Sequence, residues 1–328
     1  GNEKQIPQIR KDGELCYSVK RLASEYPAVV ILDGLSVLSH RISVLKGMVD
    51  SERDGYVQAT IAGFTNTLRF RHARPLVNLP SVEKPYGAEI RGCLTAPDGY
   101  TLCGADMTSL EDTTKRHYMK PLDPDYVAEM SRDGFDPHLD LAKHAGVITQ
   151  DDIDKHNSGE RSLKTLRKNY KVVNYSATYG IGADKLARET GMSLREARSL
   201  KDAFWSRNWS VQKVAESAKV KECLDGFWLW NPVSNFWYSL RNEKDRFSTL
   251  NQGTGVFCFD SWVAACRKQG IKTIGQFHDE VIALVEEGGE TVVKDKMEKA
   301  VSQLNKELSL NVPLGTDVQF GNTYAEIH

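Results

Sequence analysis

The spacing of hydrophobic residues changes along the chain, and the changes divide it into regions. Residues 17–47 carry apolar side chains at helical spacing, with a break at Tyr26–Pro27. The stretch 100–106, YTLCGAD, is mostly apolar and ends in an aspartate. We therefore expect an interrupted helical region near the start of the chain, followed by a buried strand whose last residue is Asp106.

Helical periodicity dominates the middle of the chain, and strand patterns return after it. In residues 136–146 an aspartate stands at the expected N-cap, a proline at the first helical position and a glycine at the end. The further predictions are a helix over 161–179, two or three helices within 184–224, a hairpin over 225–240, a helix over 254–268, a strand over 275–284, a helix over 289–309 and a final strand over 315–321. Strands towards both ends with helices between them favour an α+β fold, in which a sheet carries a helical insertion.

Composition is typical of a globular protein and predicts no membrane span. Of the 328 residues, 40% are hydrophobic and 27% are charged. No run of about 18 apolar residues is present, and the polar first residues do not resemble a signal peptide. The 6 cysteines lack metal-ligand spacing, so we expect reduced thiols and a cytoplasmic location.

Charge is nearly balanced overall but is unevenly distributed. The net charge of −1, from 43 basic and 44 acidic residues, does not by itself indicate a nucleic-acid-binding protein. The segment 161–179, however, contains no acid and these basic residues: Arg161, Lys164, Arg167, Lys168 and Lys171. A basic stripe on a neutral protein is a candidate binding surface for phosphates.

Two aspartates at predicted strands form the first candidate site. Asp106 ends one strand, and Asp279 lies within another, in GQFHDEVIAL. If both strands belong to one sheet, the carboxylates meet, and a divalent metal would relieve their repulsion. Oxygen ligands suit Mg²⁺ or Mn²⁺, and a pair of such ions would support phosphoryl chemistry. The structural alternative is a hairpin turn at Asp279–Glu280 and a helix cap at Asp106.

The basic helix forms the second candidate site. Its polar stripe consists of residues four apart: Arg167, Lys171, Tyr175 and Tyr179. The opposite, apolar face consists of Leu163, Leu166, Tyr170, Val173 and Ala177. Cations followed by aromatic rings suit a triphosphate with a base or sugar stacked above it. The alternative is an ordinary solvated face.

Other polar residues could join these sites, and each has a structural alternative. Glu111 follows Asp106 by little more than one helical turn, although an isolated glutamate is more often a surface residue. Asn251 and Gln252 precede a predicted helix and could contact base edges or sugars in a minor groove, or form a capping turn. His138, near the start of its helix, could bind nucleotide or be purely structural.

Three segments, in this order and spacing, resemble motifs of the family A DNA polymerases, the group of bacterial DNA polymerase I and many phage replicative polymerases. They are DMTSLEDT at 106, RKNYKVVNYSATYG at 167 and HDE at 278. Four other segments are similar to further characteristic stretches of the family: TLRFRHARPLVNLP, DPHLDLA, LNQGTG and the terminal GNTYAEIH. The resemblance extends from about residue 28 to the end, and EKDRFSTLNQGTG is more phage-like than bacterial.

The resemblance implies the family's right-hand polymerase fold, an antiparallel palm sheet with a large helical fingers insertion. The expected divisions are a thumb remnant and connection over 1–50, palm over 51–119, fingers over 120–240 and palm again over 241–328. The implied activity is template-directed addition of deoxynucleotides to a primer 3′ end by two-metal nucleotidyl transfer. The implied partners are primer–template DNA, dNTPs and, since no proofreading exonuclease segment is present in this chain, a missing N-terminal segment or an accessory or processivity subunit.

The resemblance also assigns roles to individual residues. Asp106 and Asp279 would hold two Mg²⁺ ions, for which Mn²⁺ could substitute. Arg167 and Lys171 would hold the triphosphate, and Lys171 would also protonate the departing pyrophosphate. The remaining implied roles are contact with the incoming sugar and base for Tyr175, the template slot for Tyr179, exclusion of a ribose 2′-hydroxyl for Glu111, nucleotide binding for His138, the primer terminus for His278 and the catalytic Glu280, and minor-groove contact for Arg69 and Gln252.

The sequence departs from the family pattern close to the expected site. Met107 replaces the usual Tyr after the first aspartate, and Asp112–Thr113 replaces Leu–Arg after the glutamate. Loss of that arginine would weaken primer or palm contacts unless Lys115 or Arg116 compensates. Tyr175 stands where many members have Phe, and the resemblance implies that this residue favours incorporation of dideoxynucleotides.

Three other functions remain open on the sequence alone. A single-subunit RNA polymerase shares the palm chemistry, but would be expected to lack Glu111 and the glutamate that follows the His–Asp pair. A metal-dependent nuclease would explain the carboxylates but not the basic aromatic helix. A non-catalytic or partner-dependent DNA-binding fragment derived from a polymerase would explain the short region before residue 50.

Overall fold

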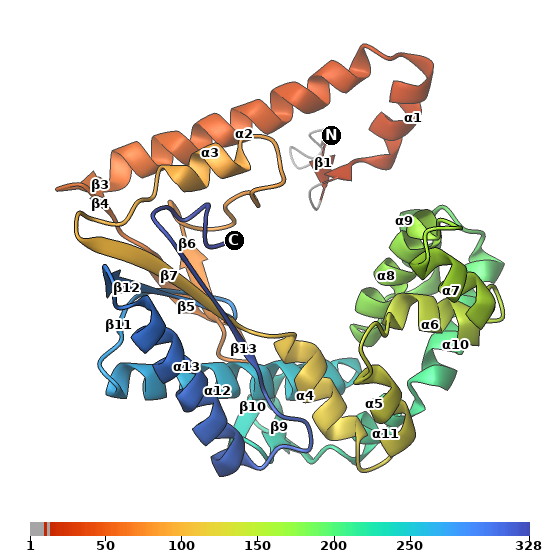
Figure 1. The fold of residues 1–328 in the computed structure, drawn as a ribbon. Helices are drawn as coiled ribbons and strands as arrows, with labels where there is room; N and C mark the ends of the chain where they lie inside the picture. The colour runs from red at the N-terminus through yellow and green to blue at the C-terminus, as the bar shows by residue number, and fades with distance from the viewer. Residues whose placement is uncertain (1–9, 12–13) are drawn as a thin grey trace.

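The centre of the molecule is a four-stranded antiparallel sheet in the order β11–β12–β7–β13 (Figure 1). The computed structural model describes residues 10–11 and 14–328. In the order of the sheet, its strands span Lys272–Phe277, Glu280–Glu286, Tyr100–Met107 and Thr316–Gly321. The sheet therefore joins one strand from the first third of the chain to strands from its end, as expected for an α+β fold.

Helices α12 (Arg246–Lys268) and α13 (Glu290–Leu308) pack against one face of this sheet. Trp262 of α12 and Met297 of α13 are fully buried there, and the indole Nε1 of Trp262 donates a hydrogen bond to the Met297 carbonyl at 3.1 Å. Because alternate residues of a strand point to opposite faces, this core takes Cys103, Ala105 and Met107 of β7.

The C-terminal residues cover part of the other face. Tyr324 and Ile327 pack with Leu102 and Ile282 of the sheet. Gly104 allows this close approach, since a Cβ atom at that position would lie 2.9 Å from the Ile327 side chain. The chain terminus is thus held on the face that also carries Asp106.

A helical insertion separates β7 from α12 in the sequence, and in Figure 1 most of it lies apart from the sheet. Its helices are α4 (Leu110–Met119), α5 (Pro124–Met130), α6 (Pro137–His144), α7 (Gln150–Asn157), α8 (Lys164–Thr178), α9 (Ala183–Thr190), α10 (Leu194–Arg207) and α11 (Trp209–Ser217). A three-stranded sheet in the order β10–β9–β8 and a short 3-10 helix follow, with β8 at Val220–Cys223, β9 at Gly226–Asn231, β10 at Phe236–Leu240 and η1 at Glu243–Asp245.

The part of the chain before β7 forms helices and short hairpins, of which the long helix α2 lies along the top of Figure 1. Its elements are β1 (Arg10–Lys11), β2 (Glu14–Leu15), α1 (Tyr17–Glu25), α2 (Val29–Ser51), β3 (Glu52–Arg53), β4 (Tyr56–Val57), β5 (Thr60–Phe64), β6 (Phe70–Ala73) and α3 (Gly87–Gly92). The predicted break at Tyr26–Pro27 is confirmed, because α1 ends just before it. None of the described helices has both the length and the apolar character needed to cross a membrane.

The structure corrects the predicted start of the helix over 254–268. Helix α12 begins at Arg246, so Asn251 and Gln252 lie inside the helix and not in a turn before it. Tertiary packing outweighs the low helix propensity of glycine here. A Cβ at Gly253 would lie 3.0 Å from the ring of Tyr238, so the absence of a side chain lets the hairpin lie against the helix.

Two other predicted elements also differ. The stretch 275–284 is not one strand but a hairpin, with His278 and Asp279 between β11 and β12. His278 takes a left-handed backbone conformation, with φ of 52°, which turns the chain there. Residues 220–223, expected to be helical, form β8, because they pair with the hairpin strand β9.

Candidate active site

Carboxylates from adjacent strands meet at one end of the central sheet. In the sheet register, Asp106 of β7 stands opposite Glu280 of β12 on one side and Asp317 of β13 on the other. Asp279 lies in the neighbouring turn, and its backbone carbonyl accepts a hydrogen bond of 3.3 Å from the Met107 amide. Burial and the negative charges of Asp317 and Asp279 raise the pKa of Asp106. The structure thus brings Asp106 and Asp279 together.

The donor set of these aspartates fits a divalent cation. Carboxylate oxygens are the ligands that Mg²⁺ and Mn²⁺ prefer, and a cation beside Asp106 would relieve the repulsion that raises its pKa. Across the part of the chain that the structure describes, no three His, Cys, Asp or Glu side chains already form a metal-binding group. A site here would therefore need further ligands from substrate or water.

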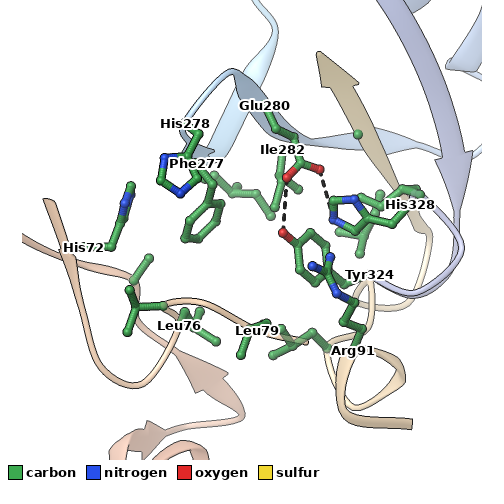
Figure 2. A pocket seen from close by; sticks show the side chains of 18 of the residues that line it. His72, Leu76, Leu79, Arg91, Phe277, His278, Glu280, Ile282, Tyr324 and His328 are labelled. Atoms are coloured by element: carbon green, nitrogen blue, oxygen red, sulfur yellow. Dashed lines mark hydrogen bonds and ion pairs between the residues drawn. The ribbon is translucent and has the colours of Figure 1, made fainter. Parts of the chain in front are cut away.

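Glu280 lies beside these aspartates but is bonded to the C-terminal residues (Figure 2). Its carboxylate accepts a hydrogen bond of 3.1 Å from the Tyr324 hydroxyl and lies 3.2 Å from Nε2 of His328. Burial, with a smaller contribution from Asp106 and Asp279, raises the pKa of Glu280 to about 7.

The contact between Glu280 and His328 joins two groups whose pKa values are both shifted towards the neutral form. Burial, and then the nearby charge of Arg91, lower the pKa of His328 to about 4. A neutral imidazole can share a proton with the protonated form of Glu280, whose pKa is high for a carboxyl group. This arrangement ties the end of the chain to the aspartate cluster.

A cavity of about 1090 Å³ opens on this face of the sheet, and Figure 2 shows part of its lining. Asp106, Asp279 and Arg69 all contribute to its wall. His278 also lines it, is exposed, and lies with its ring centroid 6.4 Å from that of His72. Burial, and then the charge of Arg69, lower the pKa of His278. The wall of the cavity thus contains both acidic and basic groups around a space large enough for a ligand.

A chain of hydrogen bonds joins the end of α8 to α4, α12 and the residue before β6. The Tyr179 hydroxyl, at the C-terminal end of α8, donates to Glu111 of α4 at 2.8 Å and accepts from the Gln252 amide at 3.2 Å. Glu111 also accepts from the Arg69 guanidinium at 3.1 Å. Burial, and then the charge of Glu111, raise the pKa of Tyr179 to about 12, so the phenol keeps its proton. We call these four residues the junction cluster.

The basic stripe of α8 is formed as predicted. The side chains on its opposite face, Tyr170, Val173 and Ala177, are buried in a core shared with α6 and α10. Lys171 and Tyr175 are exposed, and the Lys171 ammonium lies 5.8 Å from the centroid of the Tyr175 ring. Since a helix rises about 1.5 Å per residue, Arg167 lies roughly 18 Å along the helix axis from Tyr179.

Arg167 and His138 meet at the start of α6. Asp136 caps this helix by accepting hydrogen bonds from the backbone amides of His138, at 2.8 Å, and Leu139, at 3.1 Å. The Arg167 guanidinium forms an ion pair with the same carboxylate. Burial alone would raise the pKa of Asp136, but the hydrogen bonds from Arg167 and from the two amides lower it.

His138 is buried behind the stripe. Its ring centroid lies 5.9 Å from that of Tyr175, and its Nδ1 lies 3.1 Å from the Asn174 side-chain amide. Its position gives it a structural contact with the stripe and leaves little of its surface for a nucleotide.

Lys115 and Arg116, the candidates to replace a missing family arginine, are engaged within the protein. The Lys115 ammonium donates to the Asn208 side chain at 3.0 Å. Arg116 lies 2.9 Å from the Asp112 carboxylate and donates to Ser131 at 3.1 Å. Both side chains therefore join α4 to its neighbours in the helical insertion.

Sequence reasoning missed Asp317 and the C-terminal pair Tyr324 and His328. Asp317 was inside a predicted strand, but nothing in its spacing indicated that this strand pairs with β7. The terminal segment GNTYAEIH had been noticed only as a resemblance, and its contact with Glu280 depends on the packing of Ile327 on Gly104. The one sequence signal that could have indicated Asp317 is its position as an acidic residue inside the last predicted strand of the chain.

Comparisons with known proteins show which family this chain resembles. A family model described as DNA polymerase family A matches residues 28–227. DNA polymerase I of Pseudomonas aeruginosa is 25% identical over 272 residues, which are 77% of this chain and 28% of that protein. The chloroplastic/mitochondrial DNA polymerase I A of Arabidopsis thaliana is 26% identical over 348 residues, covering 95% of this chain and 32% of that protein. The chain thus spans about a third or less of the length of these relatives.

A solved structure shares the fold. The POL domain of Pol1 from M. smegmatis, in complex with DNA primer-template and dNTP, superposes with a TM-score of 0.74 at 20% sequence identity. The match covers 99% of this chain and 59% of that one. It supports the α+β polymerase fold of an antiparallel sheet with a helical insertion. Since the family model also covers well over half of the sequence, this chain belongs to DNA polymerase family A.

Proposed function

We propose that this chain catalyses template-directed addition of deoxynucleotides to the 3′ end of a primer. The observation that carries the proposal is the junction cluster, which attaches the end of the basic helix α8 to Arg69, a residue in the wall of the cavity that Asp106 and Asp279 also line. A triphosphate held by the stripe of α8 would then have its reacting end directed towards those aspartates. The related POL domain from M. smegmatis, solved with DNA primer-template and dNTP, supports the same substrates.

The proposed division of the chain follows the expected boundaries. The central sheet and its helices α12 and α13 would form the palm, from residues 51–119 and 241–328. The helical insertion over 120–240 would form the fingers. Residues 1–50 would connect the palm to a thumb, of which they would be a remnant.

Asp106 and Asp279 would hold two Mg²⁺ ions, with Mn²⁺ as a possible substitute. The chemistry supplied by bound ions is activation of the primer 3′-hydroxyl and neutralisation of charge on the pyrophosphate. Asp317 would keep the local potential negative and so favour cation binding. Glu280, held by Tyr324, would position the adjoining turn that carries Asp279.

On the fingers side, Arg167 and Lys171 would bind the triphosphate. Asp136 orients the Arg167 guanidinium through their ion pair, and two donor groups of that guanidinium can still face a phosphate. Lys171 would donate a proton to the departing pyrophosphate, since its exposed ammonium lies on the same stripe. Tyr175 would pack on the incoming sugar and base, and His138 would support Tyr175 from behind.

The proposed DNA contacts lie around the cavity and the junction cluster. The partly exposed Arg69 side chain lines the same cavity as Asp106, so its guanidinium could donate to a base edge in the minor groove. Gln252 would contact the groove from α12, and Tyr179 would occupy the template slot. His278, exposed at the turn, would contact the primer terminus.

Other parts of the protein's biology are also proposals. We infer that an accessory subunit or a preceding segment supplies the remaining grip on DNA, because multivalent contact increases the time a polymerase stays bound. The free cysteines favour a reducing, cytoplasmic location.

Primer extension tests the proposed function. A labelled primer on a short template is incubated with Mg²⁺ and four dNTPs, with an EDTA control. Metal-dependent, template-directed extension is expected. Degradation of the primer without dNTPs would indicate a nuclease, and preference for rNTPs an RNA polymerase. DNA binding without any turnover would favour the non-catalytic alternative.

The Glu111→Ala variant is expected to accept ribonucleotides more readily. The Glu111 carboxylate is held by Arg69 and Tyr179, so it would fill the space that a ribose 2′-hydroxyl needs. Its removal should raise the kcat/KM ratio of ATP to dATP by about 10- to 200-fold. The Glu298→Ala variant, which alters an exposed pair on α13, serves as the control. An unchanged ratio in Glu111→Ala would contradict this role.

The Tyr175→Phe variant is expected to discriminate more strongly against dideoxynucleotides. A dideoxynucleotide lacks the 3′-hydroxyl and the polar contact that this group makes. The hydroxyl of the exposed Tyr175 can supply a polar group in its place. We expect the kcat/KM for ddTTP, relative to dTTP, to fall about tenfold or more. Tyr170→Phe, on the buried face of the same helix, should leave the ratio unchanged. Equal ratios in the parent and Tyr175→Phe would refute the prediction.

A further inference from the structure

The small sheet β10–β9–β8 has one buried face and one aromatic face. In its register Tyr238 pairs with Leu229, and Leu240 pairs with Phe227. Leu229, Tyr238 and Leu240 are buried, and the sheet packs through this side against α12. Side chains alternate along a strand, so the residues between them point outward.

Three tryptophans occupy the outward face. Trp230 and Trp237 stand directly opposite each other on β9 and β10, with ring centroids 5.3 Å apart. Trp228 lies two residues before Trp230 in β9, on the same face, and stands opposite Ser239 of β10. All three side chains are partly exposed. Outward tryptophans are unusual on a sheet that already has a core on its other side, and such a patch indicates a binding surface.

Two cations lie over one of these rings, that of Trp237. The Lys221 ammonium is 4.3 Å and the Lys219 ammonium 5.6 Å from the ring centroid of Trp237. The nearby Asp225 carboxylate accepts a hydrogen bond of 3.0 Å from Nε1 of Trp228, which fixes the orientation of that ring. A cavity of about 430 Å³ is lined by Lys221, Trp228 and Trp237 among others.

This combination suits single-stranded nucleic acid better than an apolar protein segment. Flat rings offer stacking to any base, and ammonium groups beside them offer contacts to the phosphates between bases. A purely hydrophobic partner would leave the two lysines desolvated over the rings. The exposed Glu222 follows Lys221 in β8. Because side chains alternate along a strand, Glu222 faces away from the tryptophans.

The hairpin that carries the aromatic face is attached next to the proposed DNA site. The Tyr238 hydroxyl donates to the Gly253 carbonyl at 3.2 Å, so β10 is attached next to Gln252 of the junction cluster. On the same strand, the Ser239 carbonyl accepts from the Asn66 side chain at 3.2 Å, in the loop that precedes Arg69. A strand of DNA leaving the junction cluster would therefore pass close to β10, the strand that carries Trp237.

We propose that the outward face formed by Trp228, Trp230, Trp237, Lys219 and Lys221 binds the single-stranded 5′ overhang of the template by base stacking and phosphate contacts. The inference rests on the proposed function, because it assumes that the junction cluster holds the last base pair. It adds a binding surface for template that has not yet been copied.

Fluorescence anisotropy with labelled primer–templates tests this surface. One template carries a 5′ overhang of about ten nucleotides, within the usual range for such sites, and the other a single-nucleotide overhang. The full chain is expected to bind the long overhang more tightly. Trp237→Ala and Lys221→Ala should each weaken binding to the long overhang, the former by about 5- to 100-fold, and leave the short one unchanged.

Matched variants separate stacking from structural effects. Trp209→Ala, which removes an exposed tryptophan on α11, and Lys213→Ala, which removes an exposed lysine there, should behave as the parent. Trp237→Phe retains a ring, so it should keep most of the preference for the long overhang over the short one. This variant also provides a test if Trp237→Ala does not fold.

Several results would overturn the proposal. Affinity independent of overhang length, with extension intact, would refute this surface while leaving the proposed function standing. No binding to either DNA and no extension would refute both. If sedimentation shows a dimer that Trp237→Ala converts to a monomer, the face is a contact between copies of the chain and not a template site.

Discussion

Replacement of Asp279 by alanine is expected to reduce primer extension by about 10³-fold or more. Asp279 lies in the turn beside Met107, where its charge adds to burial and to the charge of Asp317 in raising the pKa of Asp106. Removal of its carboxylate leaves one fewer ligand for the cations that the reaction needs. The measurement is single-turnover incorporation of one dNTP at saturating Mg²⁺.

The same variant should fold normally, because it removes a like-charge interaction. Its thermal midpoint without metal is expected to equal or exceed that of the parent. Asp295→Ala, an exposed aspartate on α13, is the matched control and should retain full activity. Extension by Asp279→Ala at the parental rate would exclude Asp279 from catalysis.

Replacement of Lys171 by alanine is expected to lower kcat by about 10²- to 10³-fold. The exposed Lys171 ammonium lies on the stripe between Arg167 and Tyr175, where it can interact with the charge that develops on the departing pyrophosphate. DNA affinity should not change, since the proposed DNA contacts lie at the junction cluster. Rapid-quench incorporation and equilibrium DNA binding measure the two quantities separately.

Lys185→Ala on α9 is the control for a general loss of positive charge. This lysine pairs with Glu189 at 3.5 Å and is exposed, so its loss should leave kcat unchanged. A parallel loss of DNA affinity and kcat in Lys171→Ala would instead assign the residue to DNA binding. An unchanged kcat would remove it from the chemical step.

Local sequence patterns were sufficient to predict features that depend on a single helix or strand. Both faces of α8 were predicted because the helical period alone places Tyr170 and Val173 opposite Lys171. The start of α6 was predicted for the same kind of reason, since Asp136 caps the helix through bonds to its own next residues. These contacts span only a few residues and need no knowledge of the remaining fold.

Predictions failed where packing between distant elements outweighed local preference. The glycines at 253 and 255 suggested that α12 starts after them, yet Tyr238 and Leu110 pack against those positions and the helix continues through both. The strand expected over 275–284 contains a turn, because the chain reverses at His278 and Asp279 so that β12 can pair with β11 along one edge and with β7 along the other. The spacing of hydrophobic residues does not show where the chain reverses within 275–284, nor which side chains pack against the glycines of α12.

The sequence by itself determined that the chain has an α+β fold, that α8 presents cations and rings together, and that its motifs match one polymerase family. Only the tertiary structure decided which groups share a site. Asp317 joins Asp106 through strand pairing, and His328 reaches Glu280 because the terminus packs over Gly104. The physical reason is that periodicity reports which face of an element is buried, whereas partners far apart in sequence are chosen by the packing of whole elements.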